Sequence, residues 1–393
     1  MIKHIFRLLW NKRKANGLMI LEIFLSFLVL YILLLFVFIN IGKYKTPLGF
    51  ATEDRWMIKQ SYSRDSVTLA QNNILLEDAL GHLDRVKSIA FSGPCSPFSG
   101  YTWQSTNDHF GFEMQYKIVE ANEDYSETMN IPVIQGRWFE EGDLNQKYAP
   151  IVVTKDYIDK YFPGKNMVDS IGLVENVFPE GTREYKIIGV TEEYKYEGEF
   201  AESYPKIFRY LPKEDEQSTV IYLDMEKGTP ATYEKEVNDV LTSITKSSSN
   251  VILNVETMRY RNSRETWIPI IAMLIICGFL GVNVALGFFG VLWYNIQKRK
   301  SEIGLRRAVG AHTGEIGFQF VMEMILLAII GIVAGLFFAV QLPILKVFPF
   351  DAKYFYYSMV VSATFMLLLV IICALYPSRQ AANINPAIAL HED

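Results

Sequence analysis

The chain has 393 residues, of which 50% are hydrophobic and 21% charged, and its formal net charge is −5. A mean hydropathy of only +0.14 excludes a protein that lies in the membrane throughout, so the composition averages over a membrane part and an aqueous part. The acidic balance excludes a nucleic-acid-binding surface over the whole chain, because such domains are strongly basic. The cysteines, Cys95, Cys277 and Cys373, are too widely spaced to predict a disulfide framework or a metal cluster.

A basic amphipathic segment occupies residues 1–17. Apolar side chains alternate there with Lys3, Arg7, Lys12, Arg13 and Lys14, a pattern typical of a helix that lies along an anionic membrane lipid surface. The apolar run 18–41 follows and would reach about 36 Å as a helix, enough to cross a bilayer with some tilt. A cleaved signal peptide is the competing interpretation, but its apolar region would be only about 7 to 15 residues long.

The region 42–265 contains no run long enough to cross a membrane and is predicted to fold as a large α+β domain. Two β-α-β patterns bracket it, one between residues 56 and 91 and the other between residues 219 and 255. Between them, glycine and proline turns separate short β-rich runs. We therefore expect a split β-α-β lobe, residues 42–111 and 191–265, with an inserted β-rich lobe at residues 112–190.

Three further apolar runs, at residues 267–294, 314–342 and 356–376, each supply the roughly 20 residues that a membrane-crossing helix needs. With the first run they predict an α-helical membrane protein with four transmembrane helices. Basic residues concentrate before the first run and between the second and third, whereas the loop 343–355 carries only Lys346 and Lys353. The positive-inside rule therefore predicts both termini, including the tail 377–393, in the cytoplasm and the domain 42–265 outside.

No motif for nucleotide hydrolysis or hydrolytic chemistry is present. Gly164-Lys165 is followed by Asn166 and lacks the upstream glycine of the phosphate-binding loop G-x-x-x-x-G-K-[ST]. The patterns H-E-x-x-H, G-x-S-x-G and C-x-x-C are absent too, and adjacent carboxylates such as Glu140 and Glu141 are typical of solvated loops. We predict a chain with no catalytic residues and no bound metal.

The stretch 295–313 combines basic side chains with residues that end helices. Glu302 and Arg306 are spaced i,i+4, Gly310 is a natural helix terminator, and Thr313 is a natural cap for the next helix. This order predicts a short helix along the cytoplasmic membrane face, followed by a tight glycine turn. An ordinary positive-inside loop is the alternative that charge alone would favour.

Two carboxylates fall in or near the predicted spans, where burying a charge costs about 2.5 to 3.5 kcal/mol. Glu22 lies about one turn inside the interface and can reach the basic head region. Glu323 lies within the third apolar run. Gly331 and Gly335 form a G-x-x-x-G face, which is equally compatible with packing inside the chain and with dimerisation.

Three segments together resemble the FtsX-like and MacB-type permeases of ABC transporters, here without an ATPase domain. SEIGLRRAVGAHTGEIGFQFVMEM is similar to the cytoplasmic signature of that family, including its Q-F-x-x-E segment at Gln319, Phe320 and Glu323. On this resemblance we prefer, for Glu323, a structural role near the inner interface over a proton relay. IVEANEDYSETMNIPVIQGRWFEEGD resembles the extracytoplasmic segment that ends in a G-R-x-F turn. The tail resembles the ending P-x-x-x-A-A-x-x-x-P-x-x-A-L, carried by Pro377, Ala381, Ala382, Pro386, Ala389 and Leu390.

The resemblance implies a non-catalytic permease subunit of the bacterial cytoplasmic (inner) membrane. ATP and magnesium would be bound by a separate cytoplasmic ABC ATPase, a second permease would form a homodimer or heterodimer with this chain, and a periplasmic adaptor or client could bind outside. The implied ATPase-coupling residues are Lys298, Arg299, Glu302, Ile303, Gly304, Leu305, Arg306, Arg307 and Gly310.

The function implied is coupling of ATP hydrolysis to movement of the outer domain, for export or extraction of an antimicrobial compound, a peptide or a lipoprotein. An FtsX-like activator of a cell-wall hydrolase is one alternative. A membrane sensor or adhesion protein that binds a ligand outside is another, although it would normally need a cytoplasmic output domain. A membrane-anchored hydrolase would need a nucleophile or metal constellation that the sequence does not contain.

Overall fold

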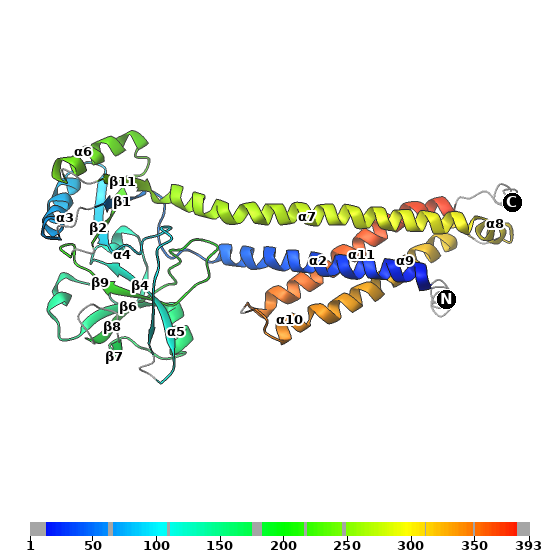
Figure 1. Ribbon diagram of the computed structural model, residues 1–393, viewed down its shortest axis with the longest axis horizontal. Helices are drawn as coiled ribbons and strands as arrows, with labels where there is room; N and C mark the ends of the chain where they lie inside the picture. The colour runs from blue at the N-terminus through cyan, green and yellow to red at the C-terminus, as the bar shows by residue number, and fades with distance from the viewer. Residues whose placement is uncertain are drawn as a thin grey trace. The chain divides into compact units, whose positions relative to one another are not determined.

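The computed structural model describes residues 13–61, 66–107, 111–174, 183–215, 218–245, 249–310, 312–348 and 350–382. The chain divides into two compact units, Met1–Gly42 with Trp267–Asp393, and Lys43–Thr266 (Figure 1). We call the first the membrane unit and the second the outer domain. Of the predicted amphipathic segment 1–17, residues 1–12 lie outside the described part of the chain.

Long apolar helices build the membrane unit. Among the described residues, four helices are long and apolar enough to cross a bilayer, as the sequence predicted. The helices that contribute to this unit are α2 (Arg13–Lys45), α7 (Val255–Lys298), α8 (Lys300–Ala308), α9 (Thr313–Ala339), α10 (Gln341–Ile344) and α11 (Ala352–Ala382).

Several helix boundaries differ from the hydropathy pattern, and two of them differ by six residues or more. Helix α7 begins at Val255, well before the Trp267 expected from the apolar run, so the helix starts inside the outer domain. Helix α11 continues through Pro377 to Ala382, past the residue 376 expected as its end. In both cases a polar stretch extends the helix, and hydropathy cannot detect such an extension.

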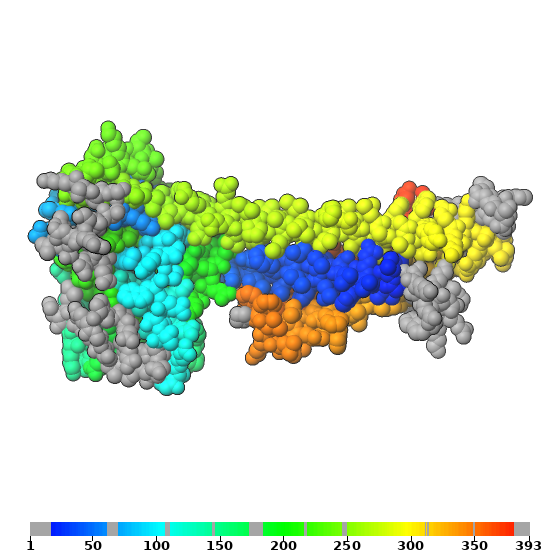
Figure 2. Space-filling view, viewed as in Figure 1, coloured from blue at the N-terminus to red at the C-terminus, as the bar shows by residue number. Residues whose placement is uncertain are grey.

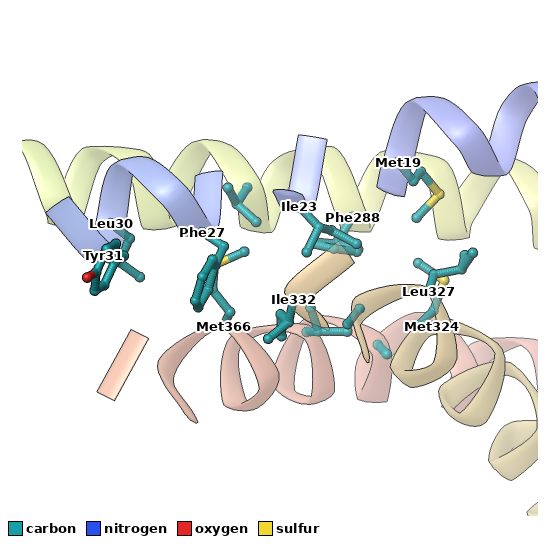
Figure 3. Packing of buried hydrophobic residues seen from close by; sticks show 14 of the residues in the cluster. Met19, Ile23, Phe27, Leu30, Tyr31, Phe288, Met324, Leu327, Ile332 and Met366 are labelled. Atoms are coloured by element: carbon teal, nitrogen blue, oxygen red, sulfur yellow. The ribbon is translucent and has the colours of Figure 1, made fainter. Parts of the chain in front are cut away.

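One face of α2 forms the centre of the membrane unit (Figure 3). Met19, Ile23, Phe27 and Leu30 are spaced four, four and three residues apart and are all buried. They face a common cluster with residues of the other helices, Ile332 of α9 and Met366 of α11 among them. Within this unit α2 lies along the membrane part of α7 (Figure 2). Since lipid is as apolar as these side chains, close packing rather than exclusion from water favours this arrangement.

The outer domain is built on an eleven-stranded sheet among the described residues, in the order β11-β1-β10-β2-β4-β9-β6-β8-β5, with β3 paired to β4 and β7 to β8. The strands are β1 (Arg55–Ser61), β2 (Val86–Ser92), β3 (Trp103–Asn107), β4 (Met114–Ala121), β5 (Val133–Gly136), β6 (Ala149–Thr154), β7 (Ile171–Val174), β8 (Arg183–Thr191), β9 (Lys206–Tyr210), β10 (Val220–Met225) and β11 (Ser249–Asn254). The helices and 3-10 turns are α3 (Ser66–Gly81), α4 (Tyr125–Thr128), η1 (Glu141–Asn145), α5 (Lys155–Tyr161), η2 (Ala231–Tyr233) and α6 (Glu234–Ile244).

The two predicted β-α-β units interleave. Strand β10 lies between β1 and β2 and is antiparallel to both, and β1 likewise lies between β10 and β11. Helices α3 and α6 lie next to each other on this lobe (Figure 1) and share a core with its strands. Successive residues of β1 face opposite sides, with Trp56 and Ile58 in this core and Met57 in the core of the other face.

The β-rich lobe contains two strands that the sequence analysis assigned to the split lobe. Strand β3, in the segment 42–111, pairs with β4 in antiparallel orientation. Strand β9, in the segment 191–265 expected for the split lobe, pairs with β4 in parallel and with β6 in antiparallel orientation. Its Ile207 is buried with Tyr116 of β4 and Val153 of β6. A boundary at residue 190 therefore misplaces β9, because strand pairing between distant segments is not visible in local patterns.

Candidate functional site

The short helix predicted between the second and third spans is α8. Helix α7 ends at Lys298, Arg299 is the N-cap residue of α8, and the helix ends with Val309 at its C-cap. Gly310 has a φ of 98°, a conformation that favours glycine, so its predicted role as terminator is confirmed. The predicted cap at Thr313 is wrong, because α9 already begins at Thr313 and His312 is its N-cap residue.

A ladder of polar side chains fixes α8 to the first turns of α9. The Arg306 guanidinium donates to Glu302 Oε1 at 2.5 Å and to Gln319 Oε1 at 3.1 Å. Gln319 Nε2 donates to Glu323 Oε1 at 3.1 Å, and Arg299 Nη1 donates to both Glu323 oxygens at 3.2 and 3.1 Å. The Arg299 guanidinium also lies 5.9 Å from the centre of the Phe320 ring. Glu323 is therefore charge-paired, as a structural role would require.

The α8 surface has one buried and one exposed apolar side. Ile303 and Gly304 are buried, and Ile303 belongs to the core of the membrane unit. Leu305 is 57% exposed and Val309 82% exposed. These two side chains lie one helical turn apart on the outward side, beside exposed Ala308. Sequence reasoning included Leu305 but missed Val309, because it followed the arginines; the i,i+4 apolar pair was the available signal.

The structure separates the remaining coupling candidates. Lys298 is exposed at the end of α7, and Arg307 is partly buried on α8. Of the C-terminal motif, Pro377 lies inside α11, and Ala381 and Ala382 form its last residues. Pro386, Ala389 and Leu390 lie outside the described residues.

Close helix contacts explain the glycines of the third span. A Cβ atom on Gly331 would lie 2.9 Å from the Ile23 side chain, and one on Gly335 would lie 2.3 Å from Phe27. Both glycines therefore let α2 approach α9 within the chain, which decides between the two interpretations that the sequence left open. Glu22, also on α2, packs its carboxylate against Gly287 of α7, at 2.5 Å from the position of a Cβ there.

The G-R-x-F segment forms a tight corner of the outer domain. Gly136 ends β5 with a φ of 69°. Arg137 donates to both carboxylate oxygens of Asp143, at 2.7 and 2.6 Å, and Phe139 is buried. The pKa of Asp143 lies below its usual range although burial raises it, because the Arg137 guanidinium and the Glu140 N–H stabilise the carboxylate. This motif is a structural corner of the domain.

Across the described residues, no group of three or more His, Cys, Asp or Glu side chains is placed to hold a metal ion. Four helices long and apolar enough to cross a membrane, a β-rich domain inserted between the first two, and a short helix joined to the third define a multi-span membrane protein with a large domain outside the spans.

Comparison with known proteins identifies the family. Residues 270–386 match the FtsX-like permease C-terminal family and residues 29–264 match the MacB-like periplasmic core domain. This chain belongs to the MacB/FtsX-like family of ABC transporter permeases, whose permease subunits are generally non-catalytic.

Individual relatives have low sequence identity to this chain. The chain is 26% identical over 320 residues to the macrolide export ATP-binding/permease protein MacB of Bartonella quintana, covering 75% of this chain and 46% of that protein. The MacB of Psychrobacter cryohalolentis is 26% identical over 290 residues, covering 70% and 42%. The chain thus spans less than half of the length of these relatives.

Two solved structures are similar to about half of this chain. The periplasmic region of MacB from Actinobacillus actinomycetemcomitans has a TM-score of 0.38 and 13% identity, covering 56% of this chain and 97% of that one. The extracellular domain of YknZ, an ABC-type transporter from Gram-positive bacteria, has a TM-score of 0.35 and 13% identity, covering 51% and 100%.

Proposed function

We propose that this chain is the transmembrane subunit of an ABC transporter complex, and that α8 is the docking site for a separate cytoplasmic ATPase. The observation that carries the proposal is the pairing of a rigid attachment with an exposed apolar surface. The ladder from Glu302 to Glu323 attaches α8 to α9, while Leu305 and Val309 face away from the unit.

Adjacent exposed apolar side chains on a charged helix indicate a contact surface, because a partner that covers them removes apolar surface from water, which is favourable. An apolar groove on the ATPase would cover Leu305, Ala308 and Val309. A movement of the ATPase groove would then move α9 together with α8, since Arg299 and Arg306 both bind side chains of α9. The resulting conformational change of the outer domain would drive transport or extraction of an antimicrobial compound, a peptide or a lipoprotein.

A second permease would complete the complex. The Gly331 and Gly335 face is occupied by α2, so it is not available to another chain. On α7, a Cβ atom on Gly278 or on Gly290 would meet nothing within 4 Å, and the large apolar side chain of Phe279 is exposed. We assign the contact with the second permease, whether identical or different, to this side of α7.

The test is to purify the full chain in mild detergent and to identify the proteins that accompany it by mass spectrometry. We expect an ABC ATPase with the unmodified chain and at least a tenfold loss of it with Leu305→Asp combined with Val309→Asp. Leu345→Asp is the matched control, because Leu345 is 69% exposed but lies after α10, at the other end of α9. Recovery of the ATPase with the double variant would refute docking at α8.

A second variant separates the ladder from the apolar surface. Arg306→Glu combined with Arg307→Glu places a carboxylate against Glu302 and removes the donor to Gln319. We expect this variant to insert into the membrane and to lose the ATPase, because α8 is no longer held in place. Unchanged co-purification would show that attachment of α8 to α9 is not required.

A further inference from the structure

Alternate side chains of one short loop connect three parts of the outer domain. The loop between β8 and β9 contains Lys195, Glu197 and Glu199, and its backbone turns between them, with the Gly198 N–H donating to the Lys195 carbonyl at 3.1 Å, so the three side chains reach different partners. Lys195 is only 1% exposed. Its Nζ donates to the carbonyl of Lys43, in the last turn of α2, at 2.8 Å, and to the carbonyl of Glu199 at 2.6 Å. A cation at the C-terminal end of a helix also stabilises the helix dipole.

Glu197 connects the same loop to the sheet. Its carboxylate forms ion pairs with Lys117 of β4 and, at 3.7 Å, with the buried Lys206 of β9. Its backbone carbonyl accepts a hydrogen bond from Asn262 Nδ2 of α7 at 3.0 Å. The loop is therefore joined both to the central strands and to α7.

Glu199 completes the set by binding the start of α7. Its Oε1 accepts from Arg259 Nε at 2.8 Å and from Arg259 Nη2 at 2.5 Å, and its Oε2 accepts from Ser263 Oγ at 2.5 Å. Gly198, between the two glutamates, has a φ of 134°, and a Cβ there would lie 2.8 Å from Asn262 Oδ1. The loop follows α7 too closely to accept a larger residue at this position.

We propose that Lys195, Glu197 and Glu199 form a three-way junction that holds the end of α2 and the start of α7 at a fixed spacing and fixes both to β4 and β9. A change in the separation of the two helices then moves the sheet rather than the loop alone. The transmission step rests on the proposed function, whereas the fixed spacing does not.

The physical reason is the cost of breaking buried charge contacts. A carboxylate left without its partner in a buried site is strongly unfavourable, so the loop follows its partners when they move. Two guanidinium nitrogens of Arg259 donate to Oε1 of Glu199 while Ser263 donates to Oε2, and these three hydrogen bonds restrict the orientation of the carboxylate more than a single lysine contact would.

The first test measures the spacing in the full chain in lipid nanodiscs. Spin labels at Lys45→Cys and Tyr260→Cys, both exposed positions beside the junction, report the distance between the two helices by double electron–electron resonance. We expect Glu199→Gln and Arg259→Gln each to widen the distance distribution at least twofold. Arg261→Gln, an exposed arginine on the same turn, is the control and should leave it unchanged. An unchanged distribution in both junction variants would overturn the proposal.

The second test uses the complex with its ATPase. Nucleotide should change amide hydrogen exchange of β9 in the unmodified complex and in Arg261→Gln. In Glu199→Gln this change should be lost while the ATPase rate stays within about twofold, a separation that a merely structural role would not produce. Retention of the nucleotide response in Glu199→Gln would overturn transmission through the junction. If no ATPase accompanies the chain, the proposed function fails, and the spin-label distances still decide whether the junction exists.

Discussion

At the scale of single residues, Gly136 shows how a family motif serves the fold. Its φ of 69° favours glycine, and a Cβ there would lie 2.2 Å from the carbonyl oxygen of Ile188. Gly136→Ala should therefore destabilise the outer domain by about 1 to 3 kcal/mol, seen as a lower apparent unfolding temperature of the full chain. Gly142→Ala is the control, because a Cβ there meets nothing within 4 Å. Equal unfolding temperatures for the two variants would contradict this explanation.

Lys195 gives a second residue-scale prediction, in the pH dependence of stability. Burial lowers the pKa of its ammonium to about 8 from 10.5; Glu193 and Glu199 oppose this shift, and Lys43 and Lys206 add to it. Below about pH 8 the Lys195 ammonium is protonated in both the folded and the unfolded chain, and the folded state bears the full free-energy cost of burying its charge. Between the two pKa values only the unfolded chain holds it, so folding becomes more favourable as the pH rises.

The comparison of the unmodified chain with Lys195→Met isolates this effect. Above pH 8, the free energy of unfolding of the unmodified chain should rise relative to that of Lys195→Met by on the order of 1 kcal/mol per pH unit. Thermal unfolding in nanodiscs at about pH 7 and about pH 9.5 measures it. A difference that does not change with pH would show that Lys195 keeps an ordinary pKa.

At the scale of elements, the α2–α9 contact predicts which glycine positions tolerate a larger side chain. Gly331→Leu should force α2 away, because Ile23 and the carbonyl of Ile20 lie within 3.1 Å of the new Cβ. Gly278→Leu on α7 should leave the stability of a single chain unchanged, since its surroundings are open. Unfolding temperature and a cross-link between α2 and α9 distinguish the two variants. Equal behaviour of both would contradict the observed packing.

At the scale of the whole molecule, the topology predicts which positions reagents reach from each side. Tyr101→Cys in the outer domain should react with a membrane-impermeant maleimide in intact spheroplasts. Val309→Cys on α8 should react only after the membrane is opened. The unmodified chain, with Cys95 and Cys277 buried and Cys373 half-buried, supplies the background. Labelling of Val309→Cys in intact spheroplasts would reverse the proposed orientation.

Features that depend on neighbouring residues could be predicted from the sequence. Four membrane-crossing helices follow from apolar length, because the bilayer requires a continuous run whatever the rest of the fold does. The Glu302–Arg306 ion pair and the turn at Gly310 follow from helix geometry and glycine conformation over a few residues. The predicted cap at Thr313 is wrong by one residue, because the exact end of a helix is only weakly determined by the local sequence.

Features that join distant segments were decided by the tertiary structure alone. The spanning helices are apolar on every side, so no periodicity marks the α2 face that packs against Gly331 and Gly335. Strand order in the sheet, the place of β9 and the contacts of Lys195 and Glu199 all link residues far apart in the chain. Local sequence determines which elements form, whereas the partners of each element depend on packing and pairing across the whole fold, which no local pattern contains.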